Sequence, residues 1–531
     1  MNSLVFVRPG SARASLRRST RACVQLLLGT GVTLALLPAC GSNWPEPKAS
    51  VSPPAMPRTN DAMMTPSAGA AGAFAPTMIA STPRMGEGQA SGQGGATAPG
   101  PLPAGVGGSP VASIAFTRAE VELMGTLSPL PAVPADPTNA LADDAEAAVL
   151  GQALFFDPAY SGPLAVGSDL GNPGDRGKVA CVSCHWGQYM DDQRSMPRDV
   201  SLGADYHARN ALTVINSSYQ RFGGWGGRFS AQWELPLAVA ESAVIMNGSR
   251  LGITHLIFDR YRSAYEAAFG TLEAALGTDS VRFPPTGKPK PAPSGSEPSP
   301  ADGAWETMTA QDQALVNTIF VNFGKAMEAY LRSLVSRDAP FDRFVAGDAT
   351  ALTLGQQRGL RLFIGQARCT DCHYGPHLSD DQFHNLGVLQ TGAHVPGQDT
   401  GRYKDMQALL ASPFNSASPW SDDPDAGLLA GLTNPPPAET QGAFRTPDLR
   451  GVALTPPYMH AGQLATLTDV IDFFDRGGDT PAVGTKDPRL VPLYLSAQDK
   501  ADLLDFLTSL NGSPPPSSLV ANPFTSTATP W

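Results

Sequence analysis

The stretch Cys181-Val182-Ser183-Cys184-His185 decides the fold of this chain, and it recurs as Cys369-Thr370-Asp371-Cys372-His373. Two cysteines separated by two residues and followed by a histidine are the attachment motif of c-type haem, in which the thiols bond to the porphyrin edge and the histidine binds the iron. One copy would also suit a redox-active dithiol or half of a zinc site. Two complete copies favour haem, so the sequence predicts two covalently bound haem c groups, with His185 and His373 as iron ligands.

Residues 1–40 carry the features of a secretory signal. Arginines between Arg8 and Arg21 precede a short apolar run, and small residues follow it. The run is too short to predict a transmembrane helix. Its end, Leu37-Pro38-Ala39-Cys40, resembles a bacterial lipoprotein processing site, which would place a lipid on Cys40; cleavage without lipidation is the alternative. The sequence therefore predicts an exported, periplasmic protein whose link to a membrane is a lipid anchor.

The cysteine count agrees with this interpretation. Four of the six cysteines lie in the two haem motifs, and Cys23 and Cys40 lie in the signal region. No pair is left for a structural disulfide in the mature domain, so in an exported chain the haems would be the covalent cross-links.

Composition divides the rest of the chain into segments. Residues 41–115 consist mainly of Ala, Gly, Pro, Ser and Thr, which bury too little apolar surface to fold, and they are predicted to form a disordered linker. Two haem domains are predicted to follow, at 116–335 and 336–512. The first contains a low-complexity loop at 284–303, and a flexible tail is predicted at 513–531.

Helical periodicity dominates both predicted haem domains. Apolar residues three or four positions apart predict amphipathic helices over Gln311–Arg337, Gln356–Ile364, Leu467–Phe474 and Ser496–Leu510. Ser496 is a suitable N-cap, with Asp499 three residues later. The sequence contains no run of alternating strands. The predicted fold is therefore mostly α, with two cytochrome c-like haem domains in tandem after a disordered tether.

The charge of the chain restricts its partners. The formal net charge is −11, whereas nucleic acids and anionic membrane surfaces are bound through basic patches. The sequence therefore predicts no nucleic-acid partner and no direct membrane-surface contact. An acidic protein can still dock a basic redox protein.

Several further motifs resemble the bacterial di-haem cytochrome c peroxidase and MauG family. They are Leu150-Gly151-Gln152-Ala153-Leu154-Phe155-Phe156-Asp157-Pro158, Arg209-Asn210-Ala211-Leu212-Thr213, Trp225-Gly226-Gly227-Arg228, Phe444-Arg445-Thr446-Pro447 and Pro457-Tyr458-Met459-His460. The resemblance implies that the first haem reacts with hydrogen peroxide, that the second stores or relays an electron, and that a calcium ion lies between the domains. It also implies a small redox protein or a protein substrate as partner, and a homodimer.

The resemblance assigns roles to individual residues. Trp225 matches the tryptophan that carries electrons between the haems; its alternative is a buried packing side chain. Asn210, Thr455 and Pro457 match the calcium positions, the last two through backbone oxygen, and oxygen ligands suit calcium. The alternative for Asn210 is a turn residue.

The chain departs from the family at the positions that handle protons. The family has a glutamine and a glutamate on the distal side of the first haem, and these positions are Leu235 and Ile245 here. Leucine and isoleucine cannot transfer the proton that peroxide cleavage requires. Glu241, one helical turn before Ile245, is the candidate substitute, and Glu234 is a weaker one.

The second departure concerns the axial ligands opposite the proximal histidines. His207 is a candidate distal ligand for the first haem by its chemistry, although not by its register. At the second haem the resemblance places a methionine or tyrosine ligand where this chain has Phe474. The second iron is then either five-coordinate or bound by another residue, with Met406, Met459 and His394 as candidates.

Three functional hypotheses follow. The first is an enzyme, a peroxide-dependent oxidase of a redox protein or of a protein side chain. The second is a di-haem electron-transfer protein without peroxidase activity, which Leu235 and Ile245 favour. The third is a sensor or binding lipoprotein whose five-coordinate iron takes a small gas.

Overall fold

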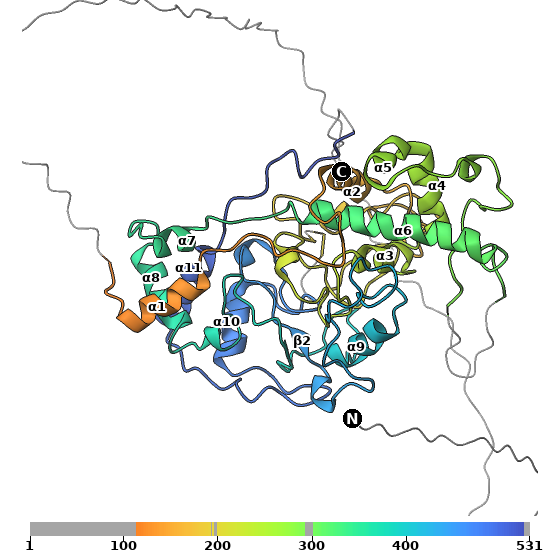
Figure 1. Ribbon diagram of the computed structural model, residues 1–531. Helices are drawn as coiled ribbons and strands as arrows, with labels where there is room; N and C mark the ends of the chain where they lie inside the picture. The colour runs from red at the N-terminus through yellow and green to blue at the C-terminus, as the bar shows by residue number, and fades with distance from the viewer. Residues whose placement is uncertain (1–112, 193, 196–198, 292–300, 525–531) are drawn as a thin grey trace, which may run out of the picture. The chain divides into compact units, whose positions relative to one another are not determined.

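Short helices and long loops make up the part of the chain that the structure describes (Figure 1). The structure is a computed structural model that describes residues 113–192, 194–195, 199–291 and 301–524, all within a unit that spans residues 102–531. The α-helices are α1 (Arg118–Leu127), α2 (Ala145–Phe156), α3 (Glu234–Glu241), α4 (Arg250–Arg260), α5 (Arg262–Phe269), α6 (Ala310–Leu331), α7 (Pro340–Val345), α8 (Leu354–Phe363), α9 (Arg402–Ala411), α10 (Leu467–Asp475) and α11 (Ala497–Thr508).

The one sheet among the described residues is very small. It pairs β1 (Phe383–His384) with β2 (Phe444–Arg445) in antiparallel register. The prediction of a mostly helical fold is therefore confirmed.

Several sequence predictions lie outside the described residues. These are the signal peptide, the lipidation of Cys40, the linker up to residue 112, part of the low-complexity loop (292–300) and the end of the tail (525–531). Within the described part of the chain, every helix is too short or too polar to cross a membrane.

The four helices predicted from periodicity are present as α6, α8, α10 and α11. Ser496 caps α11 as predicted, since its hydroxyl accepts a hydrogen bond from the Asp499 amide at 3.2 Å and the Asp499 carboxylate accepts one from the Ser496 amide at 2.9 Å. Helix α6 ends at Leu331, before the predicted end at Arg337. The reason is that both the amide and the hydroxyl of Ser333 donate to the Tyr330 carbonyl, which closes the helix with a tight turn.

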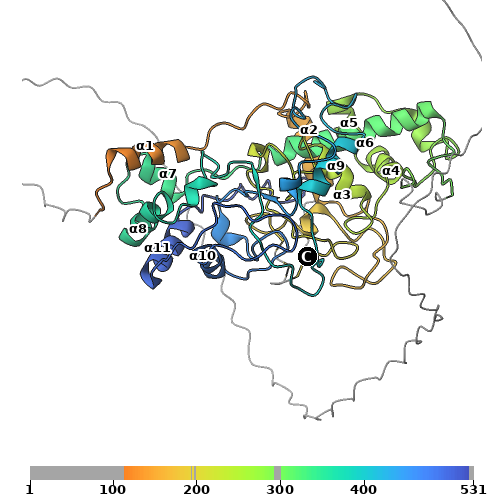
Figure 2. The ribbon, with the colours of Figure 1, turned by 90° about the horizontal axis from the view of Figure 1, so that it is seen from below.

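The first hydrophobic core forms where α2 crosses α6, with α3, α4 and α5 around them. Figures 1 and 2 both place α2 beside α5 and α6. A Cβ added at Gly151 of α2 would lie 1.9 Å from the Ala326 carbonyl oxygen of α6. The crossing therefore needs glycine at this position, and α2 also contacts the turn that carries the first C-x-x-C-H motif.

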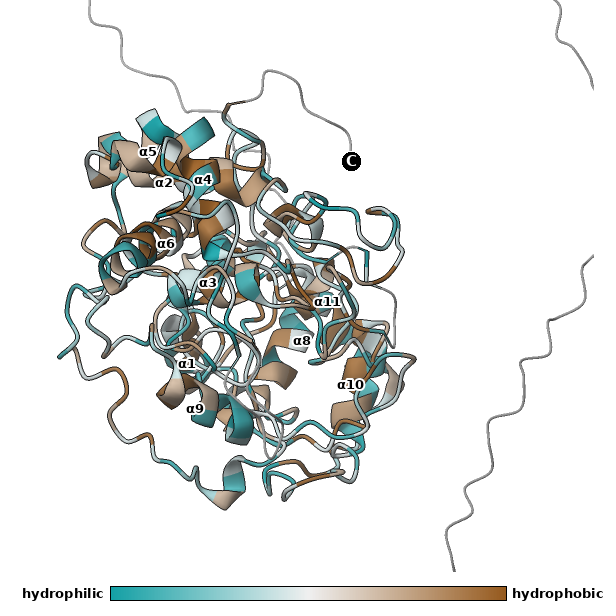
Figure 3. Cartoon of the chain, turned by 90° about the vertical axis from the view of Figure 1, so that its right-hand side faces the viewer, coloured by the Kyte–Doolittle hydropathy of each residue, from teal (hydrophilic) through white to brown (hydrophobic). Residues whose placement is uncertain are grey.

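The second hydrophobic core repeats this arrangement with α8 and α11, joined by α7 and α10. A Cβ added at Gly359 of α8 would lie 1.9 Å from the Asp502 carbonyl oxygen of α11. Helices α8 and α10 each carry hydrophobic and hydrophilic segments in Figure 3, as expected for helices with one buried face. Helix α8 ends at Phe363, close to Cys369 of the second C-x-x-C-H motif, whereas a long loop separates the end of α2 at Phe156 from Cys181 of the first.

Two segments differ from the predicted division of the chain. Helix α1 was assigned to the first haem domain, but its Met124 and Leu127 pack in the second core, and both views place α1 beside α7 and α8. Residues 513–524 were predicted to be flexible. Instead, Leu519 packs against the first core, and its carbonyl accepts a hydrogen bond from the Tyr330 hydroxyl.

Candidate functional site

The first C-x-x-C-H motif lies on a 3₁₀ turn, Cys181–Ser183, beneath α2. Burial raises the pKa of Cys181 to about 11 and that of Cys184 to about 12, and it lowers the pKa of His185 to about 4. Redox-active dithiols depend on a lowered thiol pKa. The raised values therefore argue against a redox dithiol here. The buried Nδ1 atom of His185 makes no hydrogen bond of ordinary geometry among the described residues.

The second motif lies on the equivalent turn, Cys369–Asp371. Burial raises the pKa of Cys369 to about 12 and that of Cys372 to about 11, which again disfavours a redox dithiol. His373 donates from Nδ1 to the Leu378 carbonyl at 2.8 Å. This bond fixes the imidazole tautomer and leaves Nε2 as a free donor atom for a metal.

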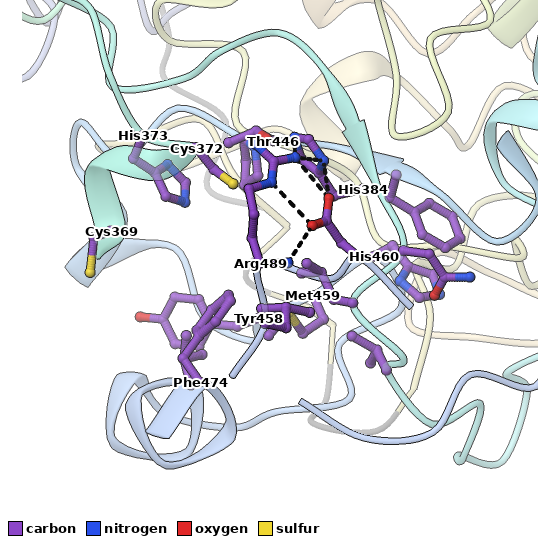
Figure 4. Close-up of a pocket in the computed structure, with 18 of the residues that line it drawn as sticks. Cys369, Cys372, His373, His384, Thr446, Tyr458, Met459, His460, Phe474 and Arg489 are labelled. Carbon is purple, nitrogen blue, oxygen red and sulfur yellow. Dashed lines mark hydrogen bonds and ion pairs between the residues drawn. The ribbon is translucent and has the colours of Figure 1, made fainter. Parts of the chain in front are cut away.

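A cavity of about 240 Å³ opens beside His373. Its walls include Cys369 and Cys372, and Figure 4 shows His373 on one side of the open space and Phe474 and Tyr458 on the other. Two thiols at the margin, an imidazole with a free Nε2 and a largely apolar wall are the set that covalent haem requires. The residues of the second motif therefore fit the group that the sequence predicts.

The zinc alternative fits less well. Donor atoms of Cys372, Asp380 and His384 do lie within 4.8 Å of one another. However, the ring nitrogens of His384 are each 2.9 Å from a carboxylate oxygen, Nε2 from Asp380 and Nδ1 from Asp487. Both nitrogens of His384 are therefore occupied. The pairing of His384 with Asp487 was not predicted from the sequence, because the two residues are far apart along the chain.

Trp225 lies where the two motif regions meet. Its indole Nε1 donates to the Asn210 carbonyl at 2.9 Å, and its own carbonyl accepts from the Arg445 amide at 2.7 Å. The indole is 6.4 Å from the His460 ring, measured between centroids. Trp225 lines both the cavity beside His373 and a smaller pocket of about 90 Å³. The predicted bridging residue is therefore near the second site.

The loop that carries Trp225 is clamped by α9. A Cβ added at Gly226 would lie 1.9 Å from Oδ2 of Asp405, and Arg402 donates to the carbonyls of Gly226 and Gly227. Asp405 in turn accepts from the buried guanidinium of Arg209 at 2.6 Å. Together these contacts fix the position of the indole.

The smaller pocket collects the predicted calcium residues. Asn210, Thr455 and Pro457 all line it, together with the buried carboxylate of Asp191 and the half-buried carboxylate of Asp448. Burial raises the pKa of Asp191 to about 7 and that of Asp448 to about 6. Carboxylates beside amide and backbone oxygens suit a hard cation such as calcium. Neither Asp191 nor Asp448 was predicted from the sequence as a calcium ligand, although Asp191 closely follows the first motif.

Glu241, the candidate proton donor, is held by another side chain. Its Oε1 and Oε2 accept hydrogen bonds from the Arg250 guanidinium at 3.0 and 2.7 Å, and Oε1 also accepts from the Arg250 amide. Both carboxylate oxygens of Glu241 are therefore engaged by Arg250. Helix α3 ends at Glu241, so Ile245 does not lie one helical turn after it as expected; Ile245 follows in a turn and packs against the first core.

Glu234, the weaker candidate, is buried at the start of α3. Its Oε1 accepts from the hydroxyl and amide of Ser230 and from the amide of Ala231, whereas Oε2 has no partner among the described residues. Burial raises the pKa of Glu234 to about 8. Glu234 can therefore hold a proton at neutral pH.

The candidate axial ligands lie in different places. His207 Nδ1 is 3.0 Å from the Arg209 carbonyl, and burial lowers the pKa of His207. His394 stacks on Tyr206 at 3.3 Å and pairs with Asp199, and Met406 is buried in α9. Of the candidates for the second iron, Met459 is the one that lines the cavity beside His373.

Comparison with known proteins places this geometry in a family. A family model described as di-haem cytochrome c peroxidase matches residues 145–350. The cytochrome-c peroxidase IdrP1 of Denitromonas iodatirespirans is 34% identical over 401 residues, which cover 73% of this chain and 87% of the relative. The IdrP1 protein of Pseudomonas sp. strain SCT is 31% identical over 417 residues, 76% of this chain and 90% of the relative.

More distant relatives agree. The methylamine utilization protein MauG of Methylorubrum extorquens is 27% identical over 379 residues, covering 70% of this chain and 79% of the relative. A crystal structure of a MauG-like protein associated with microbial copper homeostasis superimposes with a TM-score of 0.51 at 26% identity, over 75% of this chain and 99% of that one. The chain belongs to the di-haem cytochrome c peroxidase and MauG family of oxidoreductases.

Proposed function

We propose that the chain is an exported di-haem c-type oxidoreductase that uses hydrogen peroxide to oxidise a small redox protein or a protein side chain. In this proposal Cys181 and Cys184 attach the first haem, Cys369 and Cys372 attach the second, and His185 and His373 bind the two irons. When bound, the haems supply the one-electron iron chemistry of peroxide reduction. The overall reaction takes two electrons from the donor and two protons from solvent, and it converts one hydrogen peroxide into two waters.

One observation carries this proposal. The indole of Trp225 lines the cavity beside His373 and donates to the Asn210 carbonyl of the first motif region, while the backbone carbonyl of Trp225 accepts from the Arg445 amide of the second. An aromatic ring at the junction of two redox sites is well placed to pass electrons between them. Asn210, Thr455 and Pro457 would bind calcium in the adjoining pocket with the help of Asp191, and the ion would hold the two regions in register.

A second function is favoured by a specific observation. Leu235 and Ile245 replace the polar residues of the family, and Glu241 is occupied by Arg250. If no other group delivers the proton, the protein is a di-haem electron carrier without peroxidase activity. Within α3, Glu234 is the other acidic residue, and it is buried. If the protein is an enzyme, we propose that Glu234 holds the proton needed for peroxide cleavage.

The cellular setting is part of the proposal. Residues 1–40 support export to the periplasm, and Cys40 would be the lipidated residue of a membrane-anchored form. The acidic chain would meet its donor in that compartment. The family resemblance supports a homodimer.

The test is a donor-oxidation assay on the haem-loaded, full-length protein. A reduced small c-type cytochrome is mixed with the protein, and hydrogen peroxide is added in limiting amounts. The proposal predicts rapid oxidation of two cytochromes for each peroxide. Oxidation no faster than in the protein-free control would overturn the enzyme hypothesis and favour the electron carrier.

Glu241→Gln separates a proton donor from a structural partner. We expect donor oxidation to stay within about twofold of wild type, while the free energy of unfolding falls by about 1–3 kcal/mol because Arg250 loses a charged partner. A large loss of donor oxidation with unchanged stability would make Glu241 the acid. Urea unfolding and the donor assay on the same preparation measure both effects.

A further inference from the structure

We propose that the iron held by His373 has an open sixth position, and that its apolar distal wall makes the second site a binding site for a small neutral diatomic ligand such as carbon monoxide. This inference rests on the proposed function, because it requires haem at the second motif. It assigns the second site a capacity beyond electron storage.

The proximal side of the site is already complete. His373 lines the cavity, and because its Nδ1 donates to the Leu378 carbonyl, Nε2 is the ring nitrogen left to bind a metal. Cys369 and Cys372 stand at the margin of the same cavity, which fixes the face on which the porphyrin would lie. The sixth ligand, if there were one, would have to come from the wall opposite His373.

That wall is formed by one face of α10. Leu467, Val470, Ile471 and Phe474 all line the cavity, and their spacing of three, one and three residues places them on a single helix face. None of these side chains can bind iron. The helix therefore presents an apolar surface at the position where the resemblance assigns a methionine or tyrosine ligand.

The other cavity side chains with suitable donor atoms are engaged elsewhere. His384 is held by Asp380 and Asp487. His460 stacks on Phe444 at 3.7 Å, and its Nε2 accepts from the amide of Gln390 at 2.8 Å. The Tyr458 hydroxyl donates to the Val452 carbonyl at 3.0 Å.

Met459 is the remaining candidate, and its position argues against it. Met459 lines both the cavity and the smaller pocket that contains Asn210, whereas Phe474 lines the cavity alone. Met459 therefore lies between the cavity beside His373 and the smaller pocket that contains Asn210. In Figure 4 it lies to one side, toward His460, while Phe474 and Tyr458 lie below His373.

The apolar wall also decides which ligand suits the site. Ligands that develop negative charge on the iron need a hydrogen-bond donor on the distal side, and the α10 face supplies none. A neutral diatomic molecule needs only space and an apolar surround. Carbon monoxide is therefore the appropriate probe.

The experiment counts bound carbon monoxide in the dithionite-reduced holoprotein. Haem content is measured first; fewer than two covalent haems per chain would mean that the proposed function fails. With two haems present, the variant Cys369→Ala/Cys372→Ala, which lacks the second haem, identifies the carbon monoxide bound at the second site. We expect wild type to bind one more carbon monoxide per chain than this variant.

Two substitutions on the wall sharpen the test. Phe474→Met places a thioether opposite His373, so the second haem should become low-spin and bind carbon monoxide roughly tenfold or more weakly. Phe474→Leu keeps the wall apolar and should bind like wild type. Optical and EPR spectra report the spin state independently of any activity.

Met459→Leu provides the outcome that overturns the inference. If wild type is low-spin at the second haem and binds no second carbon monoxide, and Met459→Leu gains that binding, then Met459 is the sixth ligand. We expect Met459→Leu to leave both the spectrum and the carbon monoxide count unchanged.

Discussion

The two motif regions of this chain are built alike but equipped differently. In each, a helix crosses a later helix through a glycine, Gly151 in the first and Gly359 in the second, and a C-x-x-C-H turn follows further along the chain. The histidines then differ. His373 is fixed by the Leu378 carbonyl and faces a defined cavity. The buried His185 ring instead lies against the backbone of Leu212 and Met190, and its Nδ1 makes no hydrogen bond of ordinary geometry among the described residues. The scaffold that attaches a haem is thus duplicated, while the groups that would tune each iron are not.

The largest expected effect comes from removing either pair of cysteines. Cys181→Ala/Cys184→Ala and Cys369→Ala/Cys372→Ala should each lose one of two covalent haems, because a thioether bond needs the thiol. Intact-mass measurement on protein expressed with a periplasmic haem-attachment system gives the count. Thr370→Ala, in the same turn, is the matched control and should keep both haems. Retention of two haems in a double-cysteine variant would break the proposed equivalence of the two motifs.

Trp225→Phe tests the connection between the two regions. Loss of the indole removes the hydrogen bond to the Asn210 carbonyl and the aromatic system proposed to pass electrons. Peroxide-dependent donor oxidation should fall by about tenfold or more with unchanged haem content. Trp420→Phe, which alters an indole packed on Phe414, serves as control and should have little effect. Equal rates in wild type and Trp225→Phe would make Trp225 a packing residue.

The two glycine crossings predict matching losses of stability. Gly151→Ala and Gly359→Ala should each lower the free energy of unfolding by about 1–3 kcal/mol, because the added methyl group meets a backbone carbonyl. Gly125→Ala in α1, where a Cβ meets nothing within 4 Å, should instead stabilise by about 0.5–1 kcal/mol. Denaturation of the three holoproteins in parallel gives the comparison. A neutral Gly151→Ala with a costly Gly359→Ala would show that the two cores differ in packing as well.

The last prediction is a pH dependence of folded stability in the first region. Burial raises the pKa of Glu234 from 4.5 to about 8, so the folded protein retains a proton that the unfolded chain releases between these values. Folded stability should therefore decrease as pH rises from about 4.5 to about 8. Glu234→Gln should reduce this slope in melting temperatures measured across the range. An identical slope in the variant would mean that Glu234 is not the group responsible.

Local sequence patterns predicted the parts of the fold that depend on local interactions. The three- and four-residue spacing of apolar side chains located α6, α8, α10 and α11, and the Ser496 cap followed from one side chain and its third neighbour. Residues 118–127 fell within the predicted first haem domain, because nothing in them indicates whether Leu127 packs on α2 or on Phe341; the structure packs Leu127 in the second core.

The candidate site was less predictable for the same physical reason. The motif spacing identifies the cysteines and histidines, but the presence of Asp448 beside Asn210 and the pairing of His384 with Asp487 are contacts between distant parts of the chain. The pairing of Glu241 with Arg250 joins the end of α3 to the start of α4 across a short loop. Their geometry is set by tertiary packing. The sequence showed that Phe474 stands where the family has a ligand. Only the structure showed that the α10 face around Phe474 forms a wall of the cavity.

The central claim is that two similar attachment sites form one peroxide-dependent redox centre. The most direct test is rapid mixing of the haem-loaded protein with one equivalent of hydrogen peroxide, in the fully ferric state and after half-reduction, while optical spectra are recorded. The account predicts a rapid spectral change in at least one of these states that a reduced donor reverses. Slow bleaching in both states, with no reversal by the donor, would contradict it.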